Sequence, residues 1–260
     1  MQNDTWFKSW FSSPDYLRLY EHRDTKDAKK LLTLLFGNIK LAKGASVLDL
    51  ACGNGRHSIL FAGMGYKTTG LDLSEFLIKQ AEKKLTNEYS RFKSNLKFEI
   101  KDMRDIKHSG EFDLIVNLFT SFGYFKAAKD NEKVIKGISR ALKPNGFFFF
   151  DFLNSSYLEK NLVPFDIKKF DNKSAIQIRT ISGGFVTKEI YILSGRKPHH
   201  YYPEIYHFTE RIRLLSFKEL KTMFEKHNLK IIKTFGDYNG AKFNNTKSKR
   251  LIIIAQKPIR

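Results

Sequence analysis

The sequence contains a single cysteine and no long apolar run. Cys52 has no second cysteine in the chain of 260 residues to pair with, so an internal disulfide is excluded, which suits the reducing cytosol. No apolar run approaches the roughly 20 residues that a helix needs to cross a bilayer. The first residues also lack the basic and apolar regions of a secretory signal. We therefore expect a cytoplasmic protein that does not span a membrane.

Acidic residues are few compared with basic ones. The chain has 27 Asp and Glu against 46 Lys and Arg, which gives a formal net charge of +19. Such a charge is typical of many nucleic-acid-binding proteins. The basic residues are nevertheless scattered along amphipathic segments, where a solvated face is expected, and no zinc-finger or helix-turn-helix motif accompanies them. Nucleic acid stays open as a partner but is not favoured, and the oligomeric state is not indicated.

Short apolar segments alternate with segments of helical periodicity from about residue 46 onward. The strands are expected at Val47–Leu50, Lys67–Leu73, Leu96–Ile100, Phe112–Leu118, Phe147–Phe152, Lys230–Phe235 and Arg250–Gln256, and the helices at Thr25–Phe36, Gly55–Gly63, Glu75–Leu85, Asp130–Leu142 and Ser216–His227. Apolar strands separated by helices are typical of a parallel sheet covered on both faces. We predict an α/β fold in which one of the last two strands is antiparallel, because no helix separates them.

A different pattern interrupts this alternation after residue 154. Four strand-like segments follow one another, with turn-rich pieces between them and no segment of helix length. They lie at Phe165–Phe170, Ala175–Ile181, Phe185–Leu193 and Ile205–Leu215. We expect an antiparallel sheet in a subdomain of residues 155–213, inserted into an α/β domain of residues 1–154 and 214–260.

The segment Asp49-Leu50-Ala51-Cys52-Gly53-Asn54-Gly55 joins the first strand to the next helix. Glycine lets bare backbone N–H groups approach a ligand, because it has no Cβ and can take positive φ. A carboxylate beside the loop would repel a pyrophosphate but suits a ligand that carries an amino group and a positive centre, such as S-adenosylmethionine (SAM). Cys52 is expected to be a small residue that the loop tolerates, not a nucleophile.

Polar residues follow the next three strands at the same edge of the sheet. Asp72 ends the second strand, where an acid can accept hydrogen bonds from ribose hydroxyls. Asp102 and Met103 follow the third, where a carboxylate and a backbone N–H can bind the edge of an adenine. Asn117 begins a segment rich in aromatic residues after the fourth, and such clusters are usual in small-molecule pockets.

Taken together, these segments resemble the class I SAM-dependent methyltransferase family. Ala51 departs from the family pattern, since many members have a glycine there. The resemblance implies a Rossmann-like, seven-stranded, mostly parallel sheet with helices on both faces and an inserted antiparallel sheet as a lid on the acceptor side. It also implies cofactor contacts from Tyr20, Arg23, Asp49, Ala51, Gly53, Asn54, Gly55, Asp72, Leu73, Asp102, Met103, Asn117, Leu118 and Phe119.

Further segments look like bacterial small-molecule methyltransferases, which include sugar-amine N,N-dimethyltransferases and relatives of glycine N-methyltransferase. These segments are residues 16–24, 117–125 and 151–154 together with the inserted sheet. In such enzymes an N-terminal arm closes over the cofactor. The aromatic segment of residues 6–21, which we call the arm, is therefore expected to be either a packed arm or a lid.

We expect the chain to transfer a methyl group from SAM to a nitrogen, oxygen or carbon of a small molecule, with S-adenosylhomocysteine as the product. If a general base is needed, the candidates are Tyr16, Tyr20, Tyr124 and His207. We expect no metal site, because the adjacent His199 and His200 would point in opposite directions on an extended segment. Two alternatives stay open, namely an RNA or protein methyltransferase that uses the basic surface, and a SAM-binding protein without catalysis.

Overall fold

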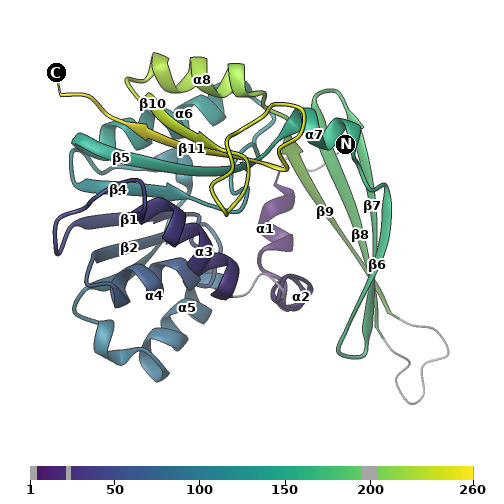
Figure 1. Ribbon diagram of the computed structural model, residues 1–260. Coiled ribbons are helices and arrows are strands. Elements are labelled where there is room, and N and C mark those ends of the chain that lie inside the picture. The colour runs from purple at the N-terminus through teal and green to yellow at the C-terminus, as the bar shows by residue number, and fades with distance from the viewer. Residues whose placement is uncertain (1–4, 22–24, 195–203, 260) are drawn as a thin grey trace.

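The computed structural model describes residues 5–21, 25–194 and 204–259, which form two β-sheets with helices around the larger one (Figure 1). The larger sheet, sheet A, has the strand order β10–β11–β5–β4–β1–β2–β3. Its strands are β1 (Ser46–Leu50), β2 (Lys67–Asp72), β3 (Leu96–Ile100), β4 (Phe112–Asn117), β5 (Leu142–Leu153), β10 (Lys230–Phe235) and β11 (Arg250–Gln256). This arrangement confirms the predicted fold class.

Neighbouring strands of sheet A are parallel except where β11 is involved. β1 pairs in parallel with both β2 and β4, and β4 pairs in parallel with β5. β11 is antiparallel to both of its neighbours, β5 and β10. The prediction that one of the last two strands is antiparallel is therefore confirmed. The carboxyl ends of β1, β2, β3 and β4 consequently meet at one edge of the sheet.

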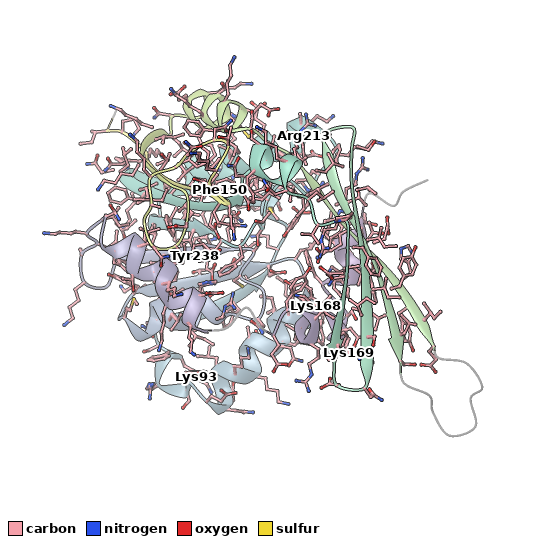
Figure 2. The ribbon with its side chains drawn as sticks, turned by 45° about the vertical axis from the view of Figure 1, so that its right-hand side comes forward. Lys93, Phe150, Lys168, Lys169, Arg213 and Tyr238 are labelled. Atoms are coloured by element: carbon pink, nitrogen blue, oxygen red, sulfur yellow. The ribbon has the colours of Figure 1, made fainter. Side chains whose placement is uncertain are left out.

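Helices cover both faces of sheet A, as Figure 1 shows. One face carries α3 (Thr25–Phe36), α4 (Arg56–Gly63) and α5 (Glu75–Asn87), and the other carries α6 (Ala128–Ala141) and α8 (Phe217–Lys226). Alternate residues of a strand serve the two faces. Val47 packs in the apolar cluster with α3, whereas Leu48 packs in the cluster with α6 and α8. Phe150 is wholly buried inside these layers, while Lys93 lies at the surface (Figure 2).

Three helices begin at serine residues whose side chains bond to the first turn, and two of these helices, α5 and α8, pack on sheet A. The Ser74 hydroxyl accepts a hydrogen bond from the backbone N–H of Leu77 at the start of α5. Ser216 and Glu219 form a capping box at the start of α8, in which each side chain bonds to the other residue's backbone. These caps satisfy N–H groups that a helix leaves unpaired at its first turn, which fixes the positions of both helices on the sheet edge.

Sheet B is the smaller, antiparallel sheet, with strand order β6–β7–β8–β9. Its strands are β6 (Phe165–Phe170), β7 (Lys173–Ser182), β8 (Phe185–Ser194) and β9 (Ile205–Arg213). Lys168 and Lys169 lie on β6 (Figure 2). The short helix α7 (Ser155–Lys160) connects β5 to this sheet and was not anticipated from the sequence. The division into residues 1–154, 155–213 and 214–260 stays a prediction.

The arm forms two short helices, α1 (Trp6–Trp10) and α2 (Pro14–Leu19), which lie between the two sheets (Figure 1). Trp10 is completely buried, and its ring lies 4.7 Å from that of Phe208 on β9. Ser74 donates a hydrogen bond of 2.8 Å to the carbonyl of Phe11. The arm is therefore packed against both sheets and forms a wall of the space between them.

Most strand and helix boundaries agree with the sequence patterns within a few residues, but β5 does not. It begins at Leu142, because Leu142 pairs with Phe112 before the register shifts toward Leu114. The sequence places Pro144-Asn145-Gly146 between the expected helix Asp130–Leu142 and the expected strand Phe147–Phe152, where it predicts a turn. Instead it forms an irregularity inside β5, with Asn145 at a φ of 61°.

Gly55 is a position where both the backbone conformation and the packing require a missing side chain. Its φ is 78°, and a Cβ would lie 2.7 Å from Phe98 and 3.0 Å from Ala81. We expect Gly55→Ala to lower the free energy of unfolding by about 3 kcal/mol, through backbone strain and overpacking together. The measurement is urea denaturation followed by circular dichroism.

Gly44→Ala is the matched control for this substitution. Gly44 has a φ of 72°, but a Cβ there would meet no described atom within 4 Å. We expect Gly44→Ala to lower the free energy of unfolding by about 1 kcal/mol, through backbone strain alone. Equal costs for the two variants would contradict the role of the Phe98 contact.

Candidate functional site

Two adjoining cavities lie at the edge of sheet A where β1, β2 and β3 end. The smaller has a volume of about 60 Å³ and the larger about 1010 Å³. Six residues line both of them: Phe11, Tyr16, Ala51, Gly53, Ser121 and Tyr124. We therefore treat the smaller cavity and the larger cavity as two parts of one site.

The structure brings most of the predicted cofactor residues to this site. Asp72, Leu73, Asp102 and Met103 line the smaller cavity, where the sequence predicts the adenosine contacts. Asp49, Asn54, Leu118 and Phe119 line the larger cavity, and Ala51 and Gly53 line both. Gly55 and Asn117 line neither cavity, although each adjoins a lining residue in the sequence. Arg23 lies outside the described residues.

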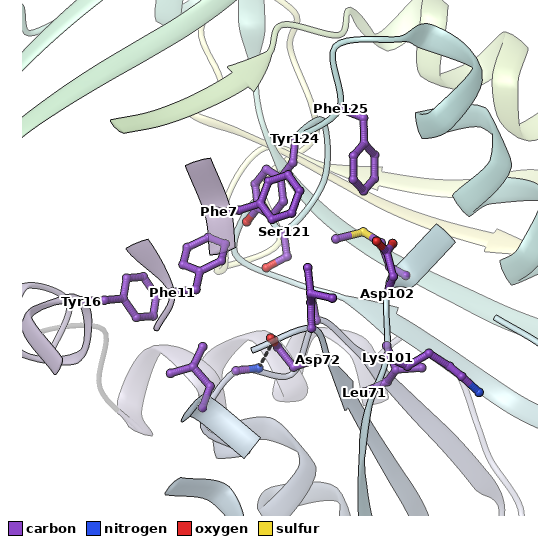
Figure 3. A pocket seen from close by; sticks show the side chains of 15 residues that line it. Phe7, Phe11, Tyr16, Leu71, Asp72, Lys101, Asp102, Ser121, Tyr124 and Phe125 are labelled. Carbon is purple, nitrogen blue, oxygen red and sulfur yellow. Dashed lines mark hydrogen bonds between the residues drawn. The ribbon is translucent and has the colours of Figure 1, made fainter. Parts of the chain in front are cut away.

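The smaller cavity is narrowed by aromatic side chains (Figure 3). Phe7 and Phe11 from the arm and Tyr124 from the loop after β4 form its lining together with Asp72 and Asp102. A volume of about 60 Å³ is far below the several hundred Å³ typical of small-molecule sites. Admitting the predicted nucleoside to this part of the site would therefore require these aromatic side chains to move apart.

The loop after β1 has the backbone conformation that a close ligand approach requires. Ala51, Gly53 and Gly55 all have positive φ, at 60°, 57° and 78°. A Cβ built on Gly53 meets no described atom within 4 Å, although Gly53 lines both cavities. The missing side chain of Gly53 thus leaves open space inside the site, which fits the expected cofactor.

Asp72 is the acid that connects the loops after β1 and β2. Its carboxylate accepts hydrogen bonds of 2.8 Å from the backbone N–H groups of Gly53 and Ser74. A carboxylate offers about four lone-pair positions, so acceptor capacity remains for ligand hydroxyl groups. Burial raises the pKa of Asp72 above its ordinary value, while the backbone N–H groups of Ser74, Gly53 and Leu73 oppose that rise. The geometry fits the predicted ribose contact.

Asp49 lies behind the loop and is only 2% exposed. Its carboxylate accepts a hydrogen bond of 2.6 Å from the Ser58 hydroxyl on α4. Burial raises the pKa of Asp49 to about 6, the Ser58 hydrogen bond lowers it in part, and the nearby Asp72 raises it further. A cationic ligand in the larger cavity would stabilise the charged form of Asp49.

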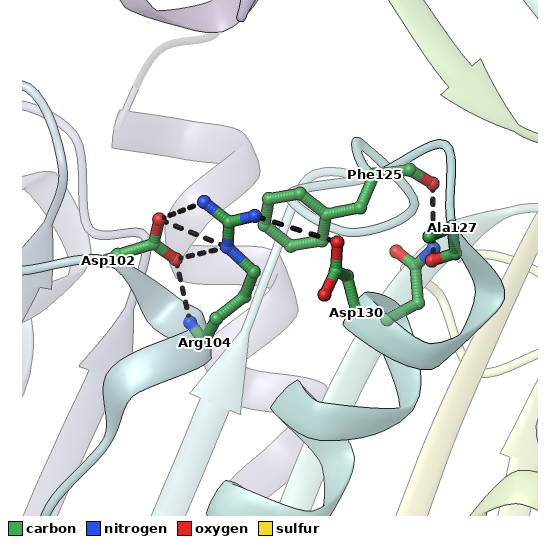
Figure 4. Close-up of polar contacts among 6 residues, drawn as sticks. Asp102, Arg104, Phe125, Ala127 and Asp130 are labelled. Atoms are coloured by element: carbon green, nitrogen blue, oxygen red, sulfur yellow. Dashed lines mark hydrogen bonds and ion pairs between the residues drawn. The ribbon is translucent and has the colours of Figure 1, made fainter. Parts of the chain in front are cut away.

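Asp102 is held in place by Arg104 (Figure 4). The guanidinium donates to both carboxylate oxygens of Asp102, over distances of 2.6 to 3.1 Å, and lies 4.3 Å above the Phe125 ring. Its other side is 3.7 Å from Asp130 on α6. Partial burial raises the pKa of Asp102, but the hydrogen bonds from Arg104 outweigh it and hold the pKa below its ordinary value. Asp102 is therefore a charged acceptor at the predicted adenine end.

Three of the four candidate bases lie at the site. Tyr16 and Tyr124 line both cavities, and Tyr20 lines the larger one. His207 lies on sheet B away from both cavities, where it is half exposed, stacks on Tyr191 and bonds to Glu189 over 2.7 Å. The structure therefore does not bring His207 to the other candidates.

Glu210 on β9 is a residue of the site that the sequence patterns did not suggest. Its carboxylate lines the larger cavity and accepts hydrogen bonds from Trp10 Nε1, over 2.7 Å, and from the Tyr20 hydroxyl, over 2.6 Å. Lys188 on β8 forms an ion pair with it over 2.5 Å. Residues two apart in a strand point to the same side, so Glu210 faces the same side of sheet B as Phe208, which contacts Trp10. This alternation along β9 is the one sequence signal that could have indicated Glu210.

Other functional candidates of the sequence give no sign of a site. Burial and the nearby Asp49 and Asp72 raise the pKa of the Cys52 thiol well above its ordinary value, which disfavours the reactive thiolate. The described residues contain no group of three or more His, Cys, Asp or Glu that could hold a metal ion, and His199 and His200 lie outside them. No helix in the described part of the chain is long and apolar enough to cross a membrane.

Comparison with known proteins places this geometry among methyltransferases. A family model of a methyltransferase domain matches residues 41–205. A ubiquinone biosynthesis O-methyltransferase of Thiobacillus denitrificans is 35% identical over 120 residues, 44% of this chain and 48% of that one. The dTDP-3-amino-3,4,6-trideoxy-alpha-D-glucopyranose N,N-dimethyltransferase of Streptomyces venezuelae is 31% identical over 104 residues, 40% of each chain. This chain therefore matches less than half the length of these relatives.

The likeness to solved structures extends over the whole fold. The crystal structure of a SAM-dependent methyltransferase from Clostridium acetobutylicum ATCC 824 has a TM-score of 0.77 at 21% identity, and the match covers 94% of this chain and 96% of that one. The predicted resemblance and the fold class, including the second sheet, are confirmed. The Clostridium acetobutylicum protein is described as SAM-dependent, which agrees with the cofactor predicted for this chain.

The buried Asp49 predicts a dependence of SAM binding on pH. Because its pKa of about 6 exceeds the ordinary value of 3.8, ionising Asp49 opposes folding, so its contribution to stability falls as the pH rises through this range. SAM carries a positive charge, which the ionised carboxylate of Asp49 attracts. SAM should therefore bind about tenfold more tightly at pH 7, where Asp49 is mostly ionised, than at pH 5. Isothermal titration calorimetry at a series of pH values measures this.

Two variants separate Asp49 from other titrating groups. Asp49→Asn should bind SAM more weakly and with little change between these pH values. Ser58→Ala should shift the transition to higher pH, because the Ser58 hydrogen bond lowers the pKa of Asp49. An unchanged pH profile in Asp49→Asn would contradict the assignment.

Proposed function

Because the chain belongs to the methyltransferase domain family, we propose that it transfers a methyl group from SAM to a nitrogen, oxygen or carbon nucleophile of a small molecule. The observation that carries the proposal is the larger cavity of about 1010 Å³, which has the cofactor loop on one side and the arm and β9 on the other. The space is walled by Trp6, Tyr20 and Glu210 in addition to the loop after β4. Such a walled cavity suits a small acceptor.

The charges around the larger cavity favour a small molecule over RNA. An RNA-binding enzyme would present a basic surface around its active site. The described residues that line the larger cavity instead mix both signs, with Arg18, Arg56 and Lys84 beside Glu21, Asp49, Glu88 and Glu210. The net charge of +19 is therefore not concentrated at this site.

SAM would supply an electrophilic methyl group on a sulfonium centre. The residues at the strand ends would hold it, with Asp72 at the ribose, Asp102 and Met103 at the adenine, and the loop from Ala51 to Gly53 at the methionine part. Such a reaction needs alignment and the exclusion of water more than acid–base help. Tyr16, Tyr20 and Tyr124 stand where they could orient an acceptor or take up its proton.

Binding and turnover test the proposal separately. We expect the protein to bind SAM and S-adenosylhomocysteine in calorimetry, and to transfer labelled methyl groups from SAM to a component of a small-metabolite extract. Gly53→Ala places a Cβ in open space of the site and should weaken binding of both by at least roughly tenfold. Absence of SAM binding refutes the proposal. Label transferred only to RNA or protein supports the macromolecular alternative, and binding without any transfer supports a non-catalytic protein.

Tyr20 connects the arm to sheet B and predicts how the arm affects the cofactor. Its hydroxyl donates to Glu210 over 2.6 Å, and its ring lines the larger cavity. Tyr20→Ala should weaken SAM binding about tenfold, and Tyr20→Phe less, because the phenylalanine keeps the ring. Calorimetry gives both affinities.

Tyr206→Phe is a matched control on the same sheet. Tyr206 donates to Glu204 over 2.8 Å, is exposed, and is not part of the lining of either cavity. We expect its SAM affinity to equal that of the unmodified protein. Unchanged affinity in Tyr20→Ala would refute a role of the arm in holding the cofactor.

A further inference from the structure

Two consecutive residues after β4 have a backbone conformation that side chains rarely adopt. Phe119 and Thr120 have φ values of 56° and 64°, in the left-handed region. Only glycine enters this region without cost, and two neighbouring non-glycine residues store strain. Both residues line the larger cavity. Strain of this kind persists only where the surrounding structure enforces it.

Asp151 on β5 holds this turn through two hydrogen bonds. Its Oδ2 accepts a hydrogen bond of 2.9 Å from the backbone N–H of Phe119, and its backbone carbonyl accepts one of 2.9 Å from the N–H of Thr120. The side chain is completely buried. One residue thus bonds to both of the strained backbone positions.

The charge of Asp151 is balanced by Arg250 on β11. Both Nε and a terminal nitrogen of Arg250 donate to Oδ1 of Asp151, over 2.8 and 2.7 Å. The Tyr238 hydroxyl donates to Oδ2 over 3.1 Å. Because Arg250 uses one oxygen and the turn uses the other, the guanidinium fixes the orientation in which Oδ2 faces Phe119.

The remainder of the loop is tied to the same site. Asn117 Nδ2 donates to the carbonyls of Leu50 and Ser121, over 3.1 and 3.0 Å. The Phe119 ring, held by the turn, lies 5.3 Å from the His57 ring and 4.8 Å from the Arg56 guanidinium, at the start of α4. A change in the turn would therefore move groups that face the cofactor loop.

We propose that Asp151 is a positioning residue for methyl transfer, which holds the strained Phe119–Thr120 turn in the form that shapes the methionine and acceptor end of the site. The proposal rests on the proposed function. Asp151 does not touch the cavity itself, and it acts through the backbone of the two residues that do. Its carboxylate is needed because both oxygens must accept hydrogen bonds.

Asp151→Asn tests this directly. The amide oxygen can stay with Arg250, but the amide NH₂ then faces the N–H of Phe119, so the turn loses its acceptor. We expect SAM affinity in calorimetry to fall about tenfold and the melting temperature to fall. Tyr238→Phe removes a single hydrogen bond to Oδ2. It should lower affinity by a smaller factor, and it serves as the variant to measure if Asp151→Asn does not fold.

Thr120→Gly distinguishes positioning from a general loss of stability. Glycine takes a φ of 64° without strain, so the turn needs less enforcement. The double variant of Asp151→Asn with Thr120→Gly should regain most of the lost SAM affinity and melting temperature. A deficit that Thr120→Gly leaves unchanged would overturn the proposal, as would normal SAM affinity in Asp151→Asn.

Asp113→Asn is the matched control for a structural carboxylate. Asp113 lies at the other end of β4 and accepts hydrogen bonds of 2.8 Å from the Ser46 N–H and from Lys143. This variant should lose stability but keep its SAM affinity, and Thr120→Gly should not rescue it. If the unmodified protein fails to bind SAM, the proposed function fails. The melting temperatures of the Asp151 and Thr120 variants then still decide whether Asp151 holds the turn.

Discussion

The hydrogen bond from the backbone N–H of Gly53 to the carboxylate of Asp72 connects the parts of this molecule that form the site. It can form because β1 and β2 are parallel and paired with Leu50 opposite Leu71, so that both strands end at the same level. The same carboxylate accepts the N–H of Ser74, whose hydroxyl donates to Phe11 in the arm. The loop after β1, the end of β2, the start of α5 and the arm are thus one continuous network. A shift of Asp72 would therefore alter the hydrogen bonds that connect these four places.

The site residues that lie in one short segment or at the ends of parallel strands could be predicted from the sequence. The loop from Asp49 to Gly55 and the acid at Asp72 follow from short patterns, because strand ends meet at one edge wherever strands and helices alternate. The groups around Asp151 and Glu210 could not be predicted in this way. Arg250 is 99 residues from Asp151, and Tyr20 is 190 residues from Glu210, so only the strand order of sheet A and the placement of the arm beside sheet B bring them together. Polar side chains in strands also carry no mark in the sequence that distinguishes a partner in a network from a solvated residue.

Strain in the described backbone gathers near the ligand edge. Six described non-glycine residues have positive φ, and three of them, Ala51, Phe119 and Thr120, line the larger cavity. The other three are Asn or Asp, which adopt this conformation more readily. Alanine at position 51 is small enough for a ligand to approach, but it costs backbone free energy that glycine would not. Proteins commonly give up stability at binding sites, because the geometry that a ligand needs is rarely the most relaxed one. The hydrogen bonds of Asp151 to the Phe119–Thr120 turn show how the neighbouring strands offset that cost.

The two sides of the site are formed by different parts of the fold. The side that we propose holds the cofactor is formed by backbone and acids at the ends of the sheet A strands, with aromatic side chains of the arm and of the loop after β4 opposite them. The side of the larger cavity that we propose takes the acceptor consists of side chains from the arm and from sheet B, and Glu210 joins these two by bonding Trp10, Tyr20 and Lys188. A substitution at Glu210 would therefore change the contacts of the arm and of sheet B together. Under the proposed function, acceptor preference and the position of the arm beside the cofactor would then depend on the same carboxylate, so a change in one would affect the other.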